Sequence, residues 1–287
     1  MEREAADVVV PVAGTAADVR AVLERMRALR LGAGDTLTVV DNRGAGVAEP
    51  EVLVATGRRT SYHARNAGAA RGSAPWIVFL DADVEPPADL LDRLLAPPRG
   101  ERVGVLAGAV LDEPATPDAR AAIRYAWLKR AMSQETTLAH GRWAFAQTAH
   151  CAVRRVAFDA VGGFRDDVRS GGDADLCWRL AAARWDLASA PGAAVVHRNR
   201  PTVGALLRQR ARHGSGAAWL GREHPGALPR RASPGLAWWA ARRFAAGLWA
   251  GARGDRDALL LGMLDGPAVW AFELGRLVPN RPRQRRR

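Results

Sequence analysis

Two aspartates one residue apart, Asp81 and Asp83, follow an apolar run in the segment FLDADVEP. Side chains two apart on a strand leave the same face, so the two carboxylates are expected to converge. Converging carboxylates repel each other unless a cation lies beside them, and oxygen ligands favour Mg²⁺ or Mn²⁺. The ordinary alternative is that Asp83 caps the helix expected after it and that Asp81 is solvated. For the pair alone this alternative is favoured. Other segments determine whether a metal site is the better interpretation.

Other segments carry further polar groups of the right kind. Asp173 stands at the start of an expected helix in GGDADLCWRL, and His197 ends an apolar strand in AAVVHRN. A carboxylate at a helix start is usually an N-cap, and a single histidine after a strand is more often structural than a ligand. The segment ARNAGAARG (64–72) has small residues and a helix start, which would let backbone approach a phosphate or ribose. Each of these signals is weak by itself.

The elements that must position these residues alternate between strand and helix. Apolar runs over 7–14, 36–42, 75–83 and 102–111 predict buried strands, and the apolar spacing over 15–34 predicts a helix. Strand, helix and strand joined by Gly-rich segments predict a parallel α/β sheet. Ligands in such sheets bind outside the carboxyl ends of the strands.

Three of the expected strand ends carry polar groups. These are Pro11 with its following loop, Asp41-Asn42 and the Asp81–Asp83 pair. Because the carboxyl ends of parallel strands meet at one edge of a sheet, the three ends point to a single cleft.

Composition indicates a cytoplasmic protein. The chain has 287 residues and 48% hydrophobic content, enough for a proper core, and its two cysteines, Cys151 and Cys177, fit neither a disulfide framework nor a zinc site. They are expected to be free thiols in a reducing cytosol. The N-terminus is charged and unlike a signal peptide, and no run of 18 apolar residues lacks a charged residue, so no spanning helix is expected.

The formal charge of +12 is concentrated in the last third of the chain. From Arg198 onward there are 18 arginines and 5 acids, whereas the first 197 residues have 24 basic and 25 acidic side chains. Such a tail suits an anionic membrane surface or a nucleic acid, but it holds no recognisable nucleic-acid motif, so no nucleic acid is expected.

Two apolar segments follow within this basic region. The segment 233–252 is an amphipathic helix with interfacial aromatics, and two interpretations stay open: it lies on anionic lipid at the inner face of the membrane, or it packs on the sheet domain. The segment 258–277 is apolar, but Asp265, Pro267 and Glu273 interrupt it, so it is not expected to span.

In their order, the motifs resemble the family 2 glycosyltransferases, which share the GT-A fold. The matching strings are VVVPVAG, VVDN, ARNAG, FLDAD, FDAVGGF, GGDADLCWRL and AVVHRN, over about residues 7 to 199. The resemblance implies an α/β, Rossmann-like, mostly parallel central sheet flanked by helices. We therefore expect a GT-A catalytic domain over residues 1–200 and a basic, Trp-rich helical extension over 201–287, disordered from about residue 279.

The resemblance also implies a function. It is the transfer of a hexosyl group from a nucleotide-sugar, a UDP-sugar by default, to an acceptor hydroxyl, with Mn²⁺ or Mg²⁺ and usually with inversion. The acceptor is unknown; a lipid-linked or polymeric one would suit membrane association. Two other functions are kept beside it: a nucleotidyltransferase on a related fold, and a non-catalytic protein that binds nucleotide-sugar or nucleic acid.

Roles follow from the resemblance residue by residue. Six residues are implied to contact the nucleotide, namely Pro11, Val12, Asp41, Asn42, Arg65 and Asn66. Asp81 would meet the ribose or the metal, Asp83 would hold the metal on the diphosphate, and His197 would be a further metal ligand or diphosphate contact. Asp173 would be the general base.

The chain departs from the family pattern at three places. Gly172 precedes Asp173 where many members have glutamate, and Asn42 stands where many have a second acid. His150 lies where a Gly-x-Asn motif is common; it either lines the acceptor site or is a half-buried structural histidine. The Gly172 departure leaves acceptor selection open.

Overall fold

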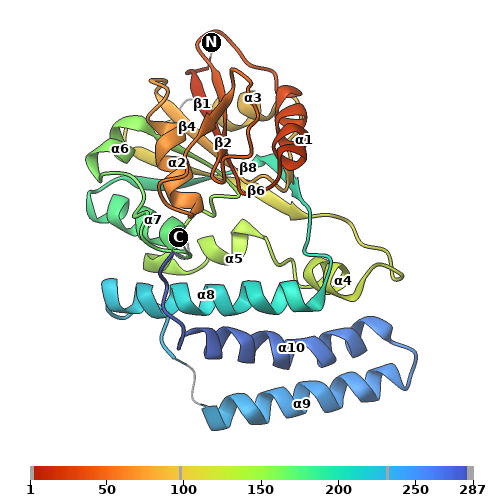
Figure 1. Ribbon diagram of the computed structural model, residues 1–287. Coiled ribbons are helices and arrows are strands. Elements are labelled where there is room, and N and C mark those ends of the chain that lie inside the picture. Colours follow the sequence, from red (N-terminus) through yellow and green to blue (C-terminus); the bar gives the residue numbers. More distant parts are fainter. Residues whose placement is uncertain (1–2, 97–98, 231–232, 283–287) are drawn as a thin grey trace. The chain divides into compact units, whose positions relative to one another are not determined.

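The computed structural model describes residues 3–96, 99–230 and 233–282, which fall into two compact units (Figure 1). The sheet unit comprises the described residues up to Leu111, Ser133–His197 and residues 281–282. The helical unit comprises Asp112–Met132 together with Arg198–Asn280. Of the expected disordered end, residues 283–287 lie outside the described residues.

The described residues of the sheet unit form an eight-stranded sheet in the order β3-β2-β1-β4-β7-β6-β8-β5. Its strands are β1 (Ala6–Val12), β2 (Thr36–Asp41), β3 (Val52–Val54), β4 (Trp76–Leu80), β5 (Val84–Glu85), β6 (Val103–Asp112), β7 (His150–Arg154) and β8 (Asp186–His197). β1 pairs in parallel with β2 and β4, and β2 with β3, whereas β7 runs antiparallel to β4 and β6, and β5 to β8. The predicted α/β architecture is confirmed.

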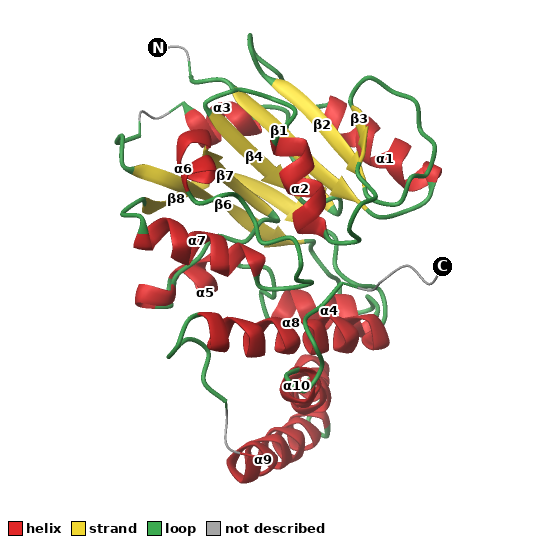
Figure 2. Cartoon of the chain, turned by 60° about the vertical axis from the view of Figure 1, so that its left-hand side comes forward, coloured by secondary structure: helices red, strands yellow, loops and turns green. Residues whose placement is uncertain are grey.

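Helices flank this sheet, with α2 and α6 on one face and α1 and α3 on the other (Figure 2). The helical segments of the unit are α1 (Ala16–Arg27), α2 (Ser61–Ala69), α3 (Leu90–Leu95), α5 (Gln134–Leu138), the 3₁₀ turn η1 (Gly141–Trp143), α6 (Arg155–Ala160) and α7 (Gly172–Ala182). α2 can approach the sheet closely because Gly68 has no side chain; a Cβ there would lie 2.9 Å from a methyl carbon of Val40. This close approach brings the polar residues of α2 to the strand ends.

The helical unit contains α4 (Ala121–Leu128), α8 (Val203–Glu223), α9 (Ser233–Gly251) and α10 (Arg256–Gly275). α10 packs against both α8 and α9, so it lies between them (Figure 1). Where α9 and α10 cross, two glycines meet: a Cβ on Gly247 would lie 2.7 Å from the Cα of Gly262. The helices predicted over 233–252 and 258–277 are both present, the second beginning two residues earlier.

Among the described residues α10 is the one helix long and apolar enough, by length and composition alone, to cross a membrane. Its central Asp265 is only 3% exposed and is surrounded by partners. The Tyr125 hydroxyl donates to it at 2.9 Å and the Arg243 guanidinium at 2.6 Å, and the Lys129 ammonium lies at 3.2 Å. Although burial alone would raise the pKa of Asp265, these partners hold it below its usual value. The negative charge in the middle of α10 is therefore balanced inside the helical unit.

Candidate active site

Asp81 and Asp83 lie in a tight turn just after β4, not on the strand itself. β4 ends at Leu80, and the Val84 amide donates to the Asp81 carbonyl at 3.3 Å to close the turn. Strand alternation therefore cannot bring the two carboxylates together, because neither aspartate is on the strand, and that prediction is wrong. The alternative that Asp83 caps the following helix is also wrong, because Asp89 occupies the N-cap of α3. Both carboxylates nevertheless stay partly exposed, with side-chain exposures of 33% for Asp81 and 27% for Asp83.

Asp81 is paired with Arg65 from α2. The Arg65 guanidinium donates to an Asp81 carboxylate oxygen through Nη2, while Arg65 is only 3% exposed. The guanidinium carbon lies 5.7 Å from the centroid of the Tyr62 ring, and Nε has no hydrogen-bond partner among the described residues. A buried cation is thus fixed beside Asp81, and it offsets the repulsion expected between neighbouring carboxylates.

Asp83 faces His197 where the short strand β5 pairs antiparallel with the end of β8. Val84 of β5 pairs with His197 of β8, which places the His197 Nε2 atom 3.4 Å from an Asp83 carboxylate oxygen. A carboxylate oxygen and an imidazole nitrogen are both ligands that Mn²⁺ accepts. No group of three or more metal-ligating side chains occurs in the part of the chain that the structure describes. The pair fits a metal whose remaining ligands come from a bound phosphate or from water.

Asp173 lies in the first turn of α7 and is half-buried. The ordinary alternative for Asp173, an N-cap, is wrong, because Gly171, with a φ of 86°, occupies that position. The Ala174 amide donates to the Asp173 carboxylate at 3.0 Å. Burial raises the pKa of Asp173 and the nearby charge of Asp81 adds to the effect, whereas the Ala174 amide and Arg65 act against it. The structure thus brings Asp173, Arg65 and Asp81 within electrostatic reach of one another.

The glycine that replaces the family's glutamate, Gly172, lies directly on an aromatic ring. A Cβ at this position would be 2.7 Å from the Cζ atom of Tyr62. Tyr62 is buried and stacks on Phe164 with 5.4 Å between ring centroids. A glutamate at position 172 would require this ring to move. Sequence reasoning missed Tyr62, which supports both Arg65 and the start of α7.

The carboxylate of Asp41, at the end of β2, is held by three backbone amides of its own loop. Asp41 has 0% exposure and accepts hydrogen bonds from the amides of Arg43 at 2.8 Å, Gly44 at 2.9 Å and Ala45. Asn42 is likewise buried and donates through Nδ2 to the carbonyls of Ala55 and Arg58. Nucleoside binding by these two residues stays a prediction.

The other residues expected at the nucleotide have mixed environments. Asn66 donates to the Phe164 carbonyl at 2.8 Å and accepts from the Phe164 amide at 3.0 Å, so its side chain ties α2 to the loop before α7. Pro11 and Val12 end β1, where Val12 is buried and Pro11 is half-buried. Their contacts with a nucleotide also stay predictions.

His150 is fully buried rather than half-buried. It begins β7 opposite Leu80, and its Nδ1 atom lies 3.3 Å from the Ala109 carbonyl. Since a carbonyl only accepts, Nδ1 carries the proton, and Nε2 has no partner among the described residues. Burial lowers the pKa of His150 to about 4, so the ring is neutral.

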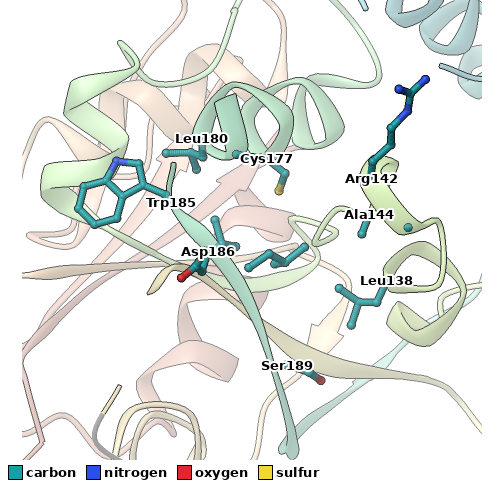
Figure 3. Close-up of a pocket in the computed structure, with 12 residues that line it drawn as sticks. Leu138, Arg142, Ala144, Cys177, Leu180, Trp185, Asp186 and Ser189 are labelled. Atoms are coloured by element: carbon teal, nitrogen blue, oxygen red, sulfur yellow. The ribbon is translucent and has the colours of Figure 1, made fainter. Parts of the chain in front are cut away.

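A cavity of about 420 Å³ lies against α7, one turn after Asp173 (Figure 3). Its wall is mainly apolar, with Cys177 and Leu180 from α7, Leu138 from α5 and Trp185 before β8. Cys177 and Cys151 are both free and buried, and burial raises the pKa of Cys177 to about 12. At neutral pH this thiol is therefore protonated and is not a nucleophile. No sequence motif marks this cavity.

Comparison with known proteins gives one family and several relatives. Residues 76–264 match the family described as "Glycosyl transferase family group 2". The pre-mycofactocin glycosyltransferase of Mycobacterium tuberculosis (strain ATCC 25618 / H37Rv) is 30% identical over 230 residues, which cover 76% of this chain and 48% of that protein. Glycosyltransferase AglE of Haloferax volcanii is 30% identical over 167 residues, covering 58% of this chain and 53% of AglE. The chain spans about half the length of these curated relatives.

Two solved structures share the architecture. The mannosyltransferase PcManGT from Pyrobaculum calidifontis, in complex with GDP-Man and Mn²⁺, superposes with a TM-score of 0.56 at 17% identity, covering 96% of this chain and 74% of that one. Glucosyl-3-phosphoglycerate synthase from Mycobacterium tuberculosis gives a TM-score of 0.52 at 18% identity, with coverages of 76% and 79%. These likenesses show the fold, and the family match extends over more than half of the sequence. The chain therefore belongs to glycosyl transferase family group 2 and has the GT-A fold.

Proposed function

We propose that this chain transfers a hexosyl group from a nucleotide-sugar to an acceptor hydroxyl, with a divalent cation and with inversion. The observation that carries the proposal is the grouping of Asp81, Asp83, Asp173 and His197 with Arg65 beside the end of β4. Ligands of α/β sheets bind at such strand ends. The family membership supports the same reaction class.

In this proposal Asp83 and His197 hold the cation, and Mn²⁺ or Mg²⁺ is the expected ion. A bound cation would supply stabilisation for the negative charge that develops on the departing nucleoside diphosphate. Asp81 orients the ribose or the ion, and Arg65 keeps the Asp81 carboxylate in place through its ion pair. Arg65 also provides a fixed positive charge at the site, which costs no reorganisation when the leaving group departs.

Asp173 takes the proton from the acceptor hydroxyl. A carboxylate that is partly desolvated binds a proton more strongly than a solvated one, and this makes Asp173 a better base near neutral pH. Attack from the face opposite the leaving group inverts the anomeric carbon. Because α7 holds Asp173 through its backbone and the Ala174 amide, the base is pre-positioned rather than recruited.

The solved structures guide only the choice of donor for the assay, and water replaces the unknown acceptor. The two solved structures contain GDP-Man and UDP-glucose respectively, so both nucleobases belong in the assay. With no acceptor known, hydrolysis of the donor by water serves as the readout, since the same base and leaving-group contacts act on water.

The decisive experiment replaces Asp173 with asparagine, which keeps the shape and removes the base. We expect donor hydrolysis to fall by about 10²–10⁴-fold, the usual contribution of a general base. Binding of UDP or GDP with Mn²⁺, measured by calorimetry, should be nearly unchanged. Since burial raises the pKa of Asp173, activity of the unmodified chain should rise with pH through a pKa above the usual aspartate value.

The matched control is Asp159→Asn on the exposed surface of α6, which should keep full activity. Wild-type turnover by Asp173→Asn would refute the assignment of the base. Nucleotide binding without any metal-dependent hydrolysis by the unmodified chain would instead favour the non-catalytic binding protein.

A further inference from the structure

Helix α9 packs on the rest of the helical unit through only one of its faces. Leu236 is buried and Ala240 and Gly251 are half-buried along this face, and Gly247 makes the close approach to Gly262 of α10. Arg243 lies on the same side and pairs with the buried Asp265. These residues recur every three or four positions, so they form a single stripe. The rest of the helix is open to solvent.

The open surface of α9 is apolar and rich in large side chains. Trp238 is 67% exposed and Trp249 65%, while Phe244 and Leu248 are each 48% exposed. Successive residues of an α-helix turn by about 100°, which places these four side chains within an arc of about 140°. The other residues of α9 in this arc are Pro234 and three alanines, so no polar group interrupts it. Soluble monomeric proteins rarely leave such a continuous apolar surface uncovered.

Positive charge borders this apolar arc, and negative charge is absent. Arg242 follows Trp238 around the helix, on one edge of the arc, and Arg253 lies in the turn just after α9. The Arg253 guanidinium carbon lies 3.3 Å from the centroid of the Trp249 ring. The sequence has no Asp or Glu between Glu223 and Asp255. The face therefore suits a partner that is apolar in its interior and anionic at its surface.

We propose that the exposed face of α9 lies on an anionic lipid bilayer, parallel to its surface. Trp238, Trp249, Phe244 and Leu248 enter the boundary between headgroups and acyl chains, and Arg242 and Arg253 contact the lipid phosphates. Tryptophan and arginine are suited to these two depths, because the ring is amphipathic and the guanidinium binds phosphate through paired donors. Exposed Arg242, in the middle of α9, opposes a spanning orientation of this helix, since it would place a charge in hydrocarbon.

The test is flotation of the full chain with vesicles of phosphatidylcholine, alone or mixed with phosphatidylglycerol. We expect co-flotation with the mixed vesicles only, and release as salt is raised, because exposed charges are screened. The double variant Trp238→Ala/Trp249→Ala should bind the mixed vesicles at least about tenfold more weakly, since it removes the two largest apolar contacts. Arg242→Gln/Arg253→Gln should reduce the preference for anionic lipid.

The matched control is Trp239→Ala. Trp239 lies on the same helix at 37% exposure but turns about 100° away from Trp238, outside the arc. It should bind like the unmodified chain. Donor hydrolysis and thermal melting should be unchanged in all three variants, which separates loss of membrane binding from misfolding and from failure of the proposed function.

Three results would overturn the proposal. They are no flotation of the unmodified chain with either vesicle, equal loss of binding in Trp239→Ala and the double tryptophan variant, or a dimer by light scattering that the double tryptophan variant converts to a monomer. The last result would assign this face to a second copy of the chain. Quenching of tryptophan fluorescence by brominated lipid, lost in the double variant, would support the bilayer.

Discussion

The ends of β2 and β4 look alike in sequence and differ in what their carboxylates do. Both strands are apolar runs that lead into an aspartate, Asp41 as the last residue of β2 and Asp81 just after β4, and only β1 lies between them in the sheet. Asp41 has no exposed surface and is held by three backbone amides. Asp81 and Asp83, after β4, keep 33% and 27% of their side-chain surface and face Arg65 and His197.

The difference separates a carboxylate that builds a loop from one that remains available to a ligand. Backbone amides that surround a carboxylate satisfy it completely and shape the chain around it. Side-chain partners leave part of the carboxylate open and can share it with an incoming metal or sugar. We therefore expect changes at the end of β4 to affect catalysis, and changes at the end of β2 to affect stability.

The largest effect is expected for Asp83→Ala. Removing one of the two side chains that would hold the cation should lower donor hydrolysis at least about 10²-fold, since a catalytic metal contributes several kcal/mol. The Mn²⁺ concentration needed for half-maximal activity should rise, while the melting temperature should change little because Asp83 is partly solvated. Steady-state rates over a Mn²⁺ titration give both values. Asp118→Ala, at an exposed position, is the control.

If Asp83→Ala hydrolysed the donor normally with an unchanged Mn²⁺ requirement, the end of β4 would not be the metal site. A catalytic role would then no longer distinguish the end of β4 from the end of β2.

Asp41→Ala should lower the stability of the fold rather than the catalytic rate. Three backbone amides would lose their charged acceptor, and the free energy of unfolding should fall by about 4 kcal/mol, less than the sum of three charged hydrogen bonds because the loop can regain water. Urea denaturation measures this loss. Exposed Asp167→Ala should leave the stability unchanged.

Calorimetry with UDP and GDP on Asp41→Ala sharpens the result. Unchanged stability together with lost nucleotide binding would make Asp41 a nucleoside ligand, as the family resemblance implies, and would break the distinction between the two strand ends.

Four strands, β1, β2, β4 and β6, could be predicted from the sequence, because each is a mostly apolar run. β3, β5 and β7 were not predicted, and β3 and β5 have only three and two residues. The turn after β4 was not predicted either, since the expected strand over 75–83 stops at Leu80 in the structure. In retrospect the loop after β2 carries a local signal. The run DNRGAG supplies glycines, Gly44 and Gly46, with φ values of 74° and 79°, which let successive amides curl around Asp41.

The family resemblance grouped these residues at one site, but the direct contacts of the open carboxylates were beyond sequence reasoning for a different reason. Arg65 meets Asp81, and His197 meets Asp83, only because helix packing and strand pairing join distant parts of the chain. No local pattern encodes these contacts. The same holds for Asp265, which interrupts an apolar run in the sequence but is buried against partners from α4 and α9.

His150 provides a smaller and finer test of the comparison, because it lies beside the end of β4 and yet is closed to solvent. Its pKa is about 4 in the folded chain, against about 6.5 for an ordinary histidine. As pH falls from about 6.5 to 4, the unfolded chain takes up the proton first, so this group should remove up to about 3 kcal/mol of stability over that range. Above pH 6.5 the imidazole is neutral in both the folded and the unfolded chain, so its protonation removes no stability.

The measurement is urea denaturation at several pH values for the unmodified chain and for His150→Gln, with exposed His140→Gln as the control. Other groups titrate over the same range, among them Asp173, whose raised pKa acts in the opposite direction, but they are common to both proteins. The difference between the two stability curves therefore isolates His150, and it should change steadily below pH 6.5. Parallel curves would mean that the ring takes up its proton in the folded chain as readily as in the unfolded one. His150 would then be reachable by water or by an acceptor, and it would belong with Asp81 and Asp83 among the open groups at the end of β4.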